Sequence, residues 1–270
     1  MSPDVRVAVF RPDDERMAEA VDLLDSLGAT PVPDPMLAVE PTGAVPGDET
    51  APGASPPAVV VLTSKTGVEL LAERGWSPDG AALACIGPRT AAAARDAGWT
   101  VDLVPGEYSS VGLVAALTGD EAAAPDVRTD AVPHVDGRRV AVARSDHGSD
   151  VLTTGLREAG ADVRETVLYR LVRPEGAGQS TVMAAGGEID AACFTSSLTV
   201  ENFLDAAGER DLRAEAIRGL NDAVVGAIGD PTRETAEGHG VRVDVVPDDA
   251  TFAALATAVV EAATATDSTG

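Results

Sequence analysis

The sequence has little lysine, few aromatic residues and almost no cysteine. Lys65 is its single lysine, aromatic residues make up 3% of its 270 positions, and Cys85 and Cys193 are its two cysteines. Each cysteine lies in a short apolar run, with no other cysteine or histidine at the spacing of metal ligands. This pattern predicts two buried free thiols rather than a redox or metal centre.

Long apolar runs and several common motifs are also missing. The sequence has no apolar stretch of about 18 residues and no apolar N-terminal segment, so we expect neither a membrane span nor a signal peptide, and a cytoplasmic location. It has no Gly-rich run ending in Gly-Lys-Ser/Thr and no Gly-x-Gly-x-x-Gly. Without a Gly-x-Ser-x-Gly segment or an evident pair of nucleophile and base, Ser or Cys hydrolase chemistry is disfavoured.

The charge is strongly negative. The chain has 44 acidic residues against 20 Lys and Arg, a net charge of -24. Nucleic acid and anionic membranes are therefore not expected as partners. With 44% hydrophobic residues, the composition is typical of a folded protein adapted to high salt, because salt screens the repulsion between like charges.

Two halves of the sequence repeat one pattern. Val60–Ser64 corresponds to Ala192–Ser196 at an offset of 132 residues, and the Ile-Gly-x-x-Thr segment at 86–90 recurs at 228–232. Earlier in each half, an apolar run that ends in arginine precedes a helical stretch and a Gly-Ala pair. The repetition predicts two domains of similar architecture.

Within each half, short apolar strands alternate with helices of roughly ten residues. This order is typical of an α/β fold with doubly wound parallel sheets, covered by helices on both faces. Segments 30–40 and 162–173 have no helical period and are expected to be extended. We expect surface loops at 41–57 and 120–136 and a frayed tail at 262–270.

Small polar residues, glycine and proline follow six predicted strands, just before a helix. Ligands of parallel sheets bind at this edge, and the free N–H groups of a helix N-terminus attract anions. Two such rims lining a cleft between domains suit a large, flexible polyanion. The same residue types are also ordinary helix caps, and only their repetition favours binding. The candidate binding residues are Arg11, Thr63, Ser64, Gly87, Thr90, Arg144, Ser145, Thr195, Ser196, Ser197 and Gly229.

The two tyrosines stand out among so few aromatic residues. Tyr108 precedes a predicted helix, and Tyr169 lies in the second extended segment, where it can face the predicted cleft. A buried tyrosine serves either as a proton donor or as a packed ring with a satisfied hydroxyl. The residues by themselves favour packing for both.

Nine short motifs occur in a fixed order along nearly the whole chain. They are Arg11-Pro12, Gly28-Ala29, Thr63-Ser64, Ile86-Gly87-Pro88-x-Thr90, Tyr108-Ser109-Ser110-x-Gly112-Leu113, Gly160-Ala161-x-Val163, Val167-x-Tyr169-Arg170, Phe194-Thr195-Ser196 and Ile228-Gly229-x-x-Thr232. Together they resemble the uroporphyrinogen-III synthase family. The resemblance implies two flavodoxin-like domains, one of residues 1–30 plus 174–270 and one of 44–161, joined by two linker strands, 31–43 and 162–173. It also implies a monomer that needs no cofactor.

By the same resemblance, the expected reaction closes the linear tetrapyrrole hydroxymethylbilane to uroporphyrinogen III, with inversion of ring D and loss of water. The carboxylates of this substrate agree with an anion-binding rim. Tyr169 matches the functionally implicated tyrosine of the family, and Thr232 matches the threonine of its Gly-x-x-Thr turn, so these two are the predicted catalytic residues. Asp230-Pro231 departs from the usual family pattern, which puts the detailed contacts of that turn in question.

Two other functions fit the same scaffold. A non-catalytic regulator that binds a tetrapyrrole or a small anion would keep the cleft but would not need Tyr169. A two-domain module that binds sugars or nucleotides normally uses aromatic rings for stacking, and here Trp76 and Trp99 both lie at predicted helix ends. The synthase is the preferred interpretation.

Overall fold

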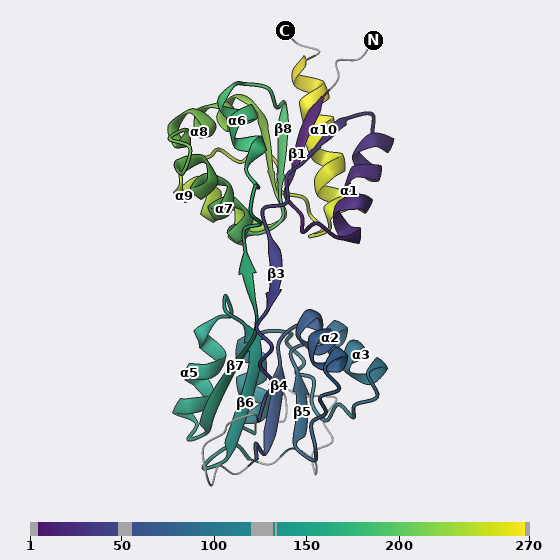
Figure 1. Ribbon diagram of the computed structural model, residues 1–270, viewed down its shortest axis with the longest axis vertical. Coiled ribbons are helices and arrows are strands. Elements are labelled where there is room, and N and C mark those ends of the chain that lie inside the picture. Colours follow the sequence, from purple (N-terminus) through teal and green to yellow (C-terminus); the bar gives the residue numbers. More distant parts are fainter. Residues whose placement is uncertain (1–4, 48–55, 120–131, 133, 268–270) are drawn as a thin grey trace. The chain divides into compact units, whose positions relative to one another are not determined.

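The computed structural model describes residues 5–47, 56–119, 132 and 134–267 (Figure 1). Within it the chain forms two compact units: unit 1 consists of Met1–Val39 and Val172–Gly270, and unit 2 of Glu40–Leu171. The expected surface loops fall partly outside the described residues, as do the last three residues of the expected frayed tail. The rest of that tail, 262–267, is helical.

Unit 1 is built on a parallel sheet with the strand order β2-β1-β8-β9. Its strands are β1 (Arg6–Val9), β2 (Thr30–Pro33), β8 (Ala191–Phe194) and β9 (Val224–Ala227). Its helices are α1 (Glu15–Ser26), α6 (Gln179–Ala185), α7 (Ser197–Gly208), α8 (Arg213–Asp222), α9 (Asp230–Gly238) and α10 (Phe252–Asp267).

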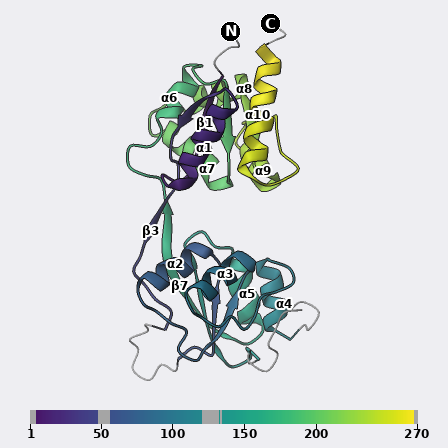
Figure 2. The same cartoon turned by 90° about the vertical axis from the view of Figure 1, so that its right-hand side faces the viewer.

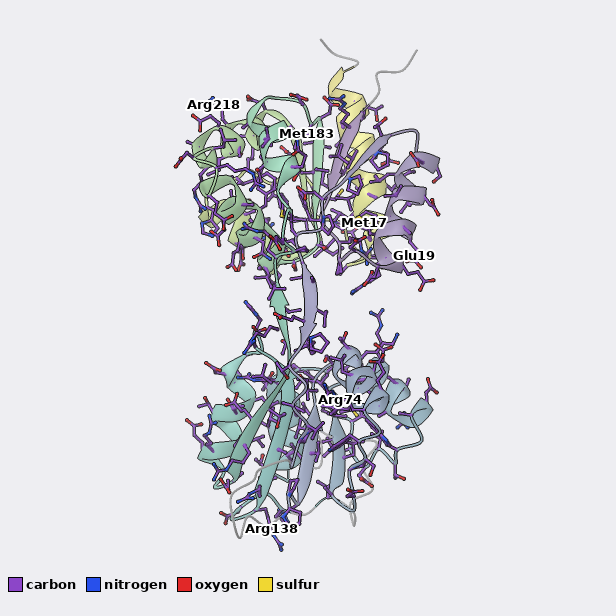
Figure 3. All side chains as sticks on the ribbon, viewed as in Figure 1. Met17, Glu19, Arg74, Arg138, Met183 and Arg218 are labelled. Atoms are coloured by element: carbon purple, nitrogen blue, oxygen red, sulfur yellow. The ribbon has the colours of Figure 1, made fainter. Side chains whose placement is uncertain are left out.

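Helices cover both faces of this sheet (Figure 1). Side chains alternate along β1, since Val7 and Val9 pack with α1 and α10 while Ala8 and Phe10 pack with α6 to α9. On α1, Met17 is buried and Glu19 is exposed; both are labelled in Figure 3. The sheet is therefore doubly wound, with one apolar core on each face.

Unit 2 has the strand order β3-β7-β6-β4-β5, in which β7, β6, β4 and β5 are parallel. Its strands are β3 (Ala38–Pro41), β4 (Val59–Leu62), β5 (Ala82–Cys85), β6 (Arg139–Ser145) and β7 (Asp162–Val172), and its helices are α2 (Lys65–Glu73), α3 (Pro88–Asp96), α4 (Ser110–Leu117) and α5 (Asp150–Glu158). Helices α4 and α5 lie side by side over one core of this sheet (Figure 2). The predicted α/β class with parallel sheets is confirmed.

The two sequence repeats do not each form one unit. The first strand, helix and strand of each repeat join the later elements of the other repeat. The offset between the repeats grows from 132 residues at Thr63 and Thr195 to 142 at Gly87 and Gly229. This difference equals the ten residues of α8, which unit 2 lacks within its described residues.

In each unit one further segment joins the sheet through a single bridge. Leu103 pairs with Ala84, and Val245 pairs with Gly226. In unit 2 the carboxylate of Asp102 accepts the N–H of Leu83, and in unit 1 that of Asp244 accepts the N–H of Val225. In each unit the carboxylate takes the place of a backbone carbonyl as the acceptor of that N–H, so the ladder of backbone hydrogen bonds between the two segments is shorter.

The extended segments expected as linkers are partly strands of the sheets. Residues 30–33 form β2 and pair with β1, and residues 162–169 pair with β6. β2 is an edge strand, and β7 is the outermost of the parallel strands in its sheet, followed only by the short β3. The sequence of a strand at such a position need not carry the continuous apolar run that marks a central strand. This is why residue pattern alone left them as extended segments.

Candidate active site

Topology places one ligand-binding edge in each unit. The bridged segment at Val245 adds a fifth position after β9, and the one at Leu103 adds a fifth position after β5. With these included, the orders β2-β1-β8-β9 and β7-β6-β4-β5 both follow the flavodoxin-like arrangement. In such sheets the crevice lies beyond the carboxyl ends of the strands where the order reverses, here between β1 and β8 and between β6 and β4. We call these two edges the unit 1 rim and the unit 2 rim.

A cavity of about 200 Å³ opens at the unit 2 rim. Five predicted site residues line it together: Thr63, Ser64, Arg144, Ser145 and Tyr169. The sequence analysis missed its other lining residues, which are Ile86, Ser110, Gly148, Ser149 and Leu152. Ser110 and Ser149 stand at the starts of helices, so the strand-end pattern used for the others could also have found them.

Tyr169 enters the cavity from a bulge in β7. The pairing with β6 slips by one residue, so that Arg144 faces Val167 but Ser145 faces Tyr169. As a result Leu168 and Tyr169 are both buried although they are consecutive, and Tyr169 is 7% exposed. The bulge directs the tyrosine side chain toward the carboxyl end of β4.

The hydroxyl of Tyr169 donates a hydrogen bond to the Oγ of Ser64, at 3.1 Å. Ser64 is the N-cap of α2, and its Oγ also accepts the N–H of Gly67 at 3.0 Å. With both contacts formed, the serine keeps its own O–H as a donor. The pair is thus a hydroxyl relay at the wall of the cavity.

Arg144 lines the cavity, but its charge is already compensated. Arg144 is 8% exposed, and its guanidinium donates to Glu165 at 2.6 Å, to Asp150 at 3.2 Å and to the carbonyl of Ser149. The backbone of Gly148 lies close against the same side chain. Arg144 therefore holds the loop after β6 in place, and less of its charge is available to a ligand than the sequence suggested.

The remaining predicted residues of unit 2 stand at the same rim. Thr63 points its hydroxyl at the carbonyl of Ala143. Gly87 is the N-cap of α3, with the ring of Tyr108 packed against its Cα, and Thr90 is buried in the first turn of that helix. Tyr108 itself is 63% exposed.

The unit 1 rim carries the matching set. Ser196 and Thr199 form a capping box on α7, and the Oγ of Ser197 donates to the carbonyl of Pro231. Gly229 is the N-cap of α9 with open space where a Cβ would point, and Thr232 is buried in the first turn of the helix. Thr195 is partly buried, and Arg11 stacks on a phenylalanine ring.

The cysteines and tryptophans take no part in either rim. Cys85 and Cys193 are buried free thiols, as predicted, and burial raises the pKa of each to about 12, which suppresses thiolate chemistry. Trp76 and Trp99 pack edge to face at 5.2 Å, so their rings stabilise each other. Among the described residues no group of acidic, His or Cys side chains could hold a metal ion, and none of the helices is long and apolar enough to cross a membrane.

Comparison with known proteins identifies relatives of the whole chain. A sequence model described as "Uroporphyrinogen-III synthase HemD" matches residues 18–257. The chain is 35% identical, over 243 residues, to a protein of Methanothermobacter thermautotrophicus named "Putative uroporphyrinogen-III synthase", covering 87% of this chain and 90% of the relative.

Solved structures share the fold. A mutant uroporphyrinogen III synthase from Thermus thermophilus is 23% identical with a TM-score of 0.64, covering 97% of this chain and 99% of the other. A uroporphyrinogen-III synthetase from Helicobacter pylori is 13% identical with a TM-score of 0.60, covering 96% and 99%. At these identities the likeness concerns the fold.

Proposed function

The chain belongs to the uroporphyrinogen-III synthase family, and from this premise we propose how its two rims carry out the reaction. Its activity is the closure of hydroxymethylbilane to uroporphyrinogen III with inversion of ring D and loss of water, which makes it a cyclising lyase of tetrapyrrole and heme biosynthesis. The observation that supports the mechanism best is the Tyr169–Ser64 hydroxyl pair in the wall of a cavity at the unit 2 rim.

The chemistry needs one proton donor. The terminal hydroxyl of the bilane must leave as water to give an electron-poor azafulvene, and ring D must attack through its already substituted carbon. A spiro intermediate then fragments and recloses. In the structure the Tyr169 O–H is donated to Ser64; with substrate bound it turns to the departing hydroxyl and donates its proton there, and the O–H of Ser64 turns to donate to the phenolate. The proton returns to the tyrosine when the closing ring loses its own, so only water is lost overall.

The rims bind the carboxylates of the substrate. Backbone N–H groups at the starts of helices and hydroxyls beside them attract anions, and the chain offers them in both units. In this proposal the binding residues are Arg11, Thr63, Ser64, Gly87, Thr90, Arg144, Ser145, Thr195, Ser196, Ser197 and Gly229. Thr232 lies in the first turn of α9 beside Gly229 and acts as a second, positioning hydroxyl.

Binding through many weak contacts also explains which constitutional isomer is formed. Hydroxymethylbilane is flexible and closes without rearrangement when left in water, so the protein must hold a folded conformer in which ring D presents its substituted carbon. No cofactor is proposed.

We further propose a cytoplasmic monomer from a salt-adapted cell. Its domains are 1–30 plus 174–270 and 44–161, with 31–43 and 162–173 as linkers. The boundaries between the two units, after Val39 and Leu171, fall inside these linkers and support the division. The net charge of -24 supports the adaptation to salt.

The ratio of product isomers tests the function directly. Purified protein in molar salt, supplied with enzymatically produced hydroxymethylbilane, is expected to yield mainly the type III isomer, while a protein-free control yields type I. Chromatography of the oxidised products measures the ratio. If the folded protein yields type I alone while still binding the tetrapyrrole, the chain is the non-catalytic regulator and the enzyme assignment fails.

A further inference from the structure

In the part of unit 1 that the structure describes, one arginine has neither a carboxylate nor a backbone carbonyl as a direct partner. Among the described residues of this unit, seven arginines form ion pairs with Asp or Glu, namely Arg6, Arg16, Arg173, Arg213, Arg218, Arg233 and Arg242. Arg210 donates to two backbone carbonyls instead. The exception is Arg11, whose guanidinium lies 4.9 Å from the centre of the Phe252 ring.

Asp14, three positions after Arg11 in the sequence, is bound by another arginine. Arg16 binds the carboxylate of Asp14 with both Nε and Nη2, and these hydrogen bonds lower the pKa of Asp14. The same carboxylate also accepts the N–H of Arg16 as the N-cap of α1. Asp14 is thereby fixed in the cap by Arg16, while Arg11 forms no direct ion pair among the described residues and is attracted to the carboxylates of Asp14 and Glu19 only from a distance.

Arg11 is also partly withdrawn from water. Burial lowers its pKa most and the charge of Arg16 lowers it further, whereas the charges of Glu19 and Asp14 raise it; the guanidinium stays protonated at neutral pH. Partial burial of a charge is unfavourable, and the face of Phe252 together with the more distant charges of Glu19 and Asp14 offsets part of that cost. In a chain with 44 acidic residues such a site is poised to accept an external anion.

The position of Arg11 coincides with the unit 1 rim. The register of β1 and β8 pairs Val9 with Cys193, and the rings of Phe10 and Phe194 stack at 4.6 Å directly after it. Arg11 and Thr195 each follow one of these two rings in the sequence, directly after the two strands between which the strand order reverses. Phe252, the first residue of α10, is close to this edge through its contact with Arg11.

We propose that Phe252 is a positioning residue, whose ring holds the guanidinium of Arg11 so that it binds a carboxylate of the substrate. The inference rests on the proposed function and adds a residue that the sequence pattern did not single out. The ring fixes the plane of the guanidinium, and its N–H groups remain free to form the paired hydrogen bonds that carboxylates accept.

Substitutions at Phe252 test the role of the ring. Phe252→Leu keeps an apolar side chain but removes the aromatic face, and it is expected to raise KM for hydroxymethylbilane about three- to tenfold, with kcat within twofold of the unmodified protein. Phe252→Tyr keeps the face and is expected to leave KM within twofold. Arg6→Gln, at the other end of β1, serves as the control and leaves KM unchanged.

A double-mutant cycle separates positioning from a general structural role. Phe252 acts through Arg11, so Arg11→Gln combined with Phe252→Leu is expected to raise KM no further than Arg11→Gln alone. The dissociation constant for uroporphyrin III, an octacarboxylate, is measured in parallel by fluorescence. It tests the contact of Arg11 with a carboxylate without any turnover.

The possible outcomes are distinct. Additive effects of the two substitutions, or equal KM values for Phe252→Leu and Phe252→Tyr, overturn the inference while type III product still supports the enzyme assignment. If the unmodified protein makes only type I product, the proposed function fails, and the cycle measured on uroporphyrin III still decides whether Phe252 positions Arg11.

Discussion

At the scale of single residues, the hydroxyl pair of Tyr169 and Ser64 carries the proposed chemistry. The tyrosine is buried, and its hydroxyl has one defined partner, so it is held in one orientation at the cavity wall. Ser64 is itself held by its role as the N-cap of α2. The same hydrogen bonds that stabilise the fold thus preorganise the donor, and a substitution tests both functions at once.

Tyr169→Phe removes the hydroxyl and keeps the ring. We expect kcat to fall about 10²-fold, since a positioned acid contributes a rate factor of that order. The free energy of unfolding is expected to fall by only about 1 kcal/mol, because one hydrogen bond is lost. Steady-state kinetics and thermal unfolding measure the two effects. Tyr108→Phe is the matched control, because that tyrosine is largely exposed, and its rate is expected to stay unchanged.

If Tyr169→Phe loses its folded structure together with its activity, the role of Tyr169 is packing and the assignment as proton donor is contradicted. Ser64→Ala distinguishes the cases further. It removes the partner of the phenol and the cap of α2, and the cap alone costs about 1 kcal/mol. If kcat falls by a larger factor than the fraction of folded protein does, the result supports a role of the Ser64 hydroxyl in the proton transfer.

At the scale of secondary structure elements, one buried carboxylate connects the end of β2 to the start of α6, both in unit 1. Asp34, 4% exposed, follows β2 and accepts the N–H groups of Gly178 and Ser180 as well as the Ser180 hydroxyl. These are donors at the start of α6, which has no side-chain cap of its own at Gly178. The start of the crossing segment is therefore fixed by a contact between residues 144 positions apart.

Asp34→Ala leaves two buried amide donors without an acceptor. We expect a loss of about 2–4 kcal/mol in unfolding free energy, and faster hydrogen exchange at Gly178 and Ser180 than elsewhere in the unit. Asp34→Asn keeps one acceptor oxygen and is expected to lose about half as much. The exposed Asp13→Ala is the control; an equal loss there would contradict the assignment to Asp34.

At the scale of the whole molecule, charge sets the conditions under which the chain folds. Acidic residues outnumber basic ones by 24, and the structure uses many of its arginines in ion pairs at the surface. Such exposed pairs contribute little, so the repulsion between the remaining carboxylates is only partly compensated. Screening by salt, which acts over a Debye length of about 3 Å at 1 M, reduces that repulsion.

Thermal unfolding at increasing salt concentration tests this point. We expect the melting temperature to rise between about 0.1 and 2 M KCl, because the folded state gathers the negative charges more closely than the unfolded chain does. A neutral osmolyte at matched water activity is the control. A melting temperature that does not change with KCl would contradict adaptation to high salt.

The sequence by itself determined the α/β class, the repeated strand and helix order and the polar residues at the strand ends. These features are local, because apolar runs, helix caps and turn residues act over a few positions. The burial of Cys85 and Cys193 was readable for the same reason.

Only the tertiary structure decided which of those residues meet. The contact of Tyr169 with Ser64 spans 105 positions and depends on a bulge in β7, and the pairing of Arg144 with Glu165 depends on the register of β6 and β7. The stacking of Arg11 on Phe252 is of the same kind, and so is the exchange of elements between the two repeats, which the residues left open and the family resemblance implied. Strand order and register bring distant segments together through packing of the whole sheet, and no short stretch of sequence contains that information.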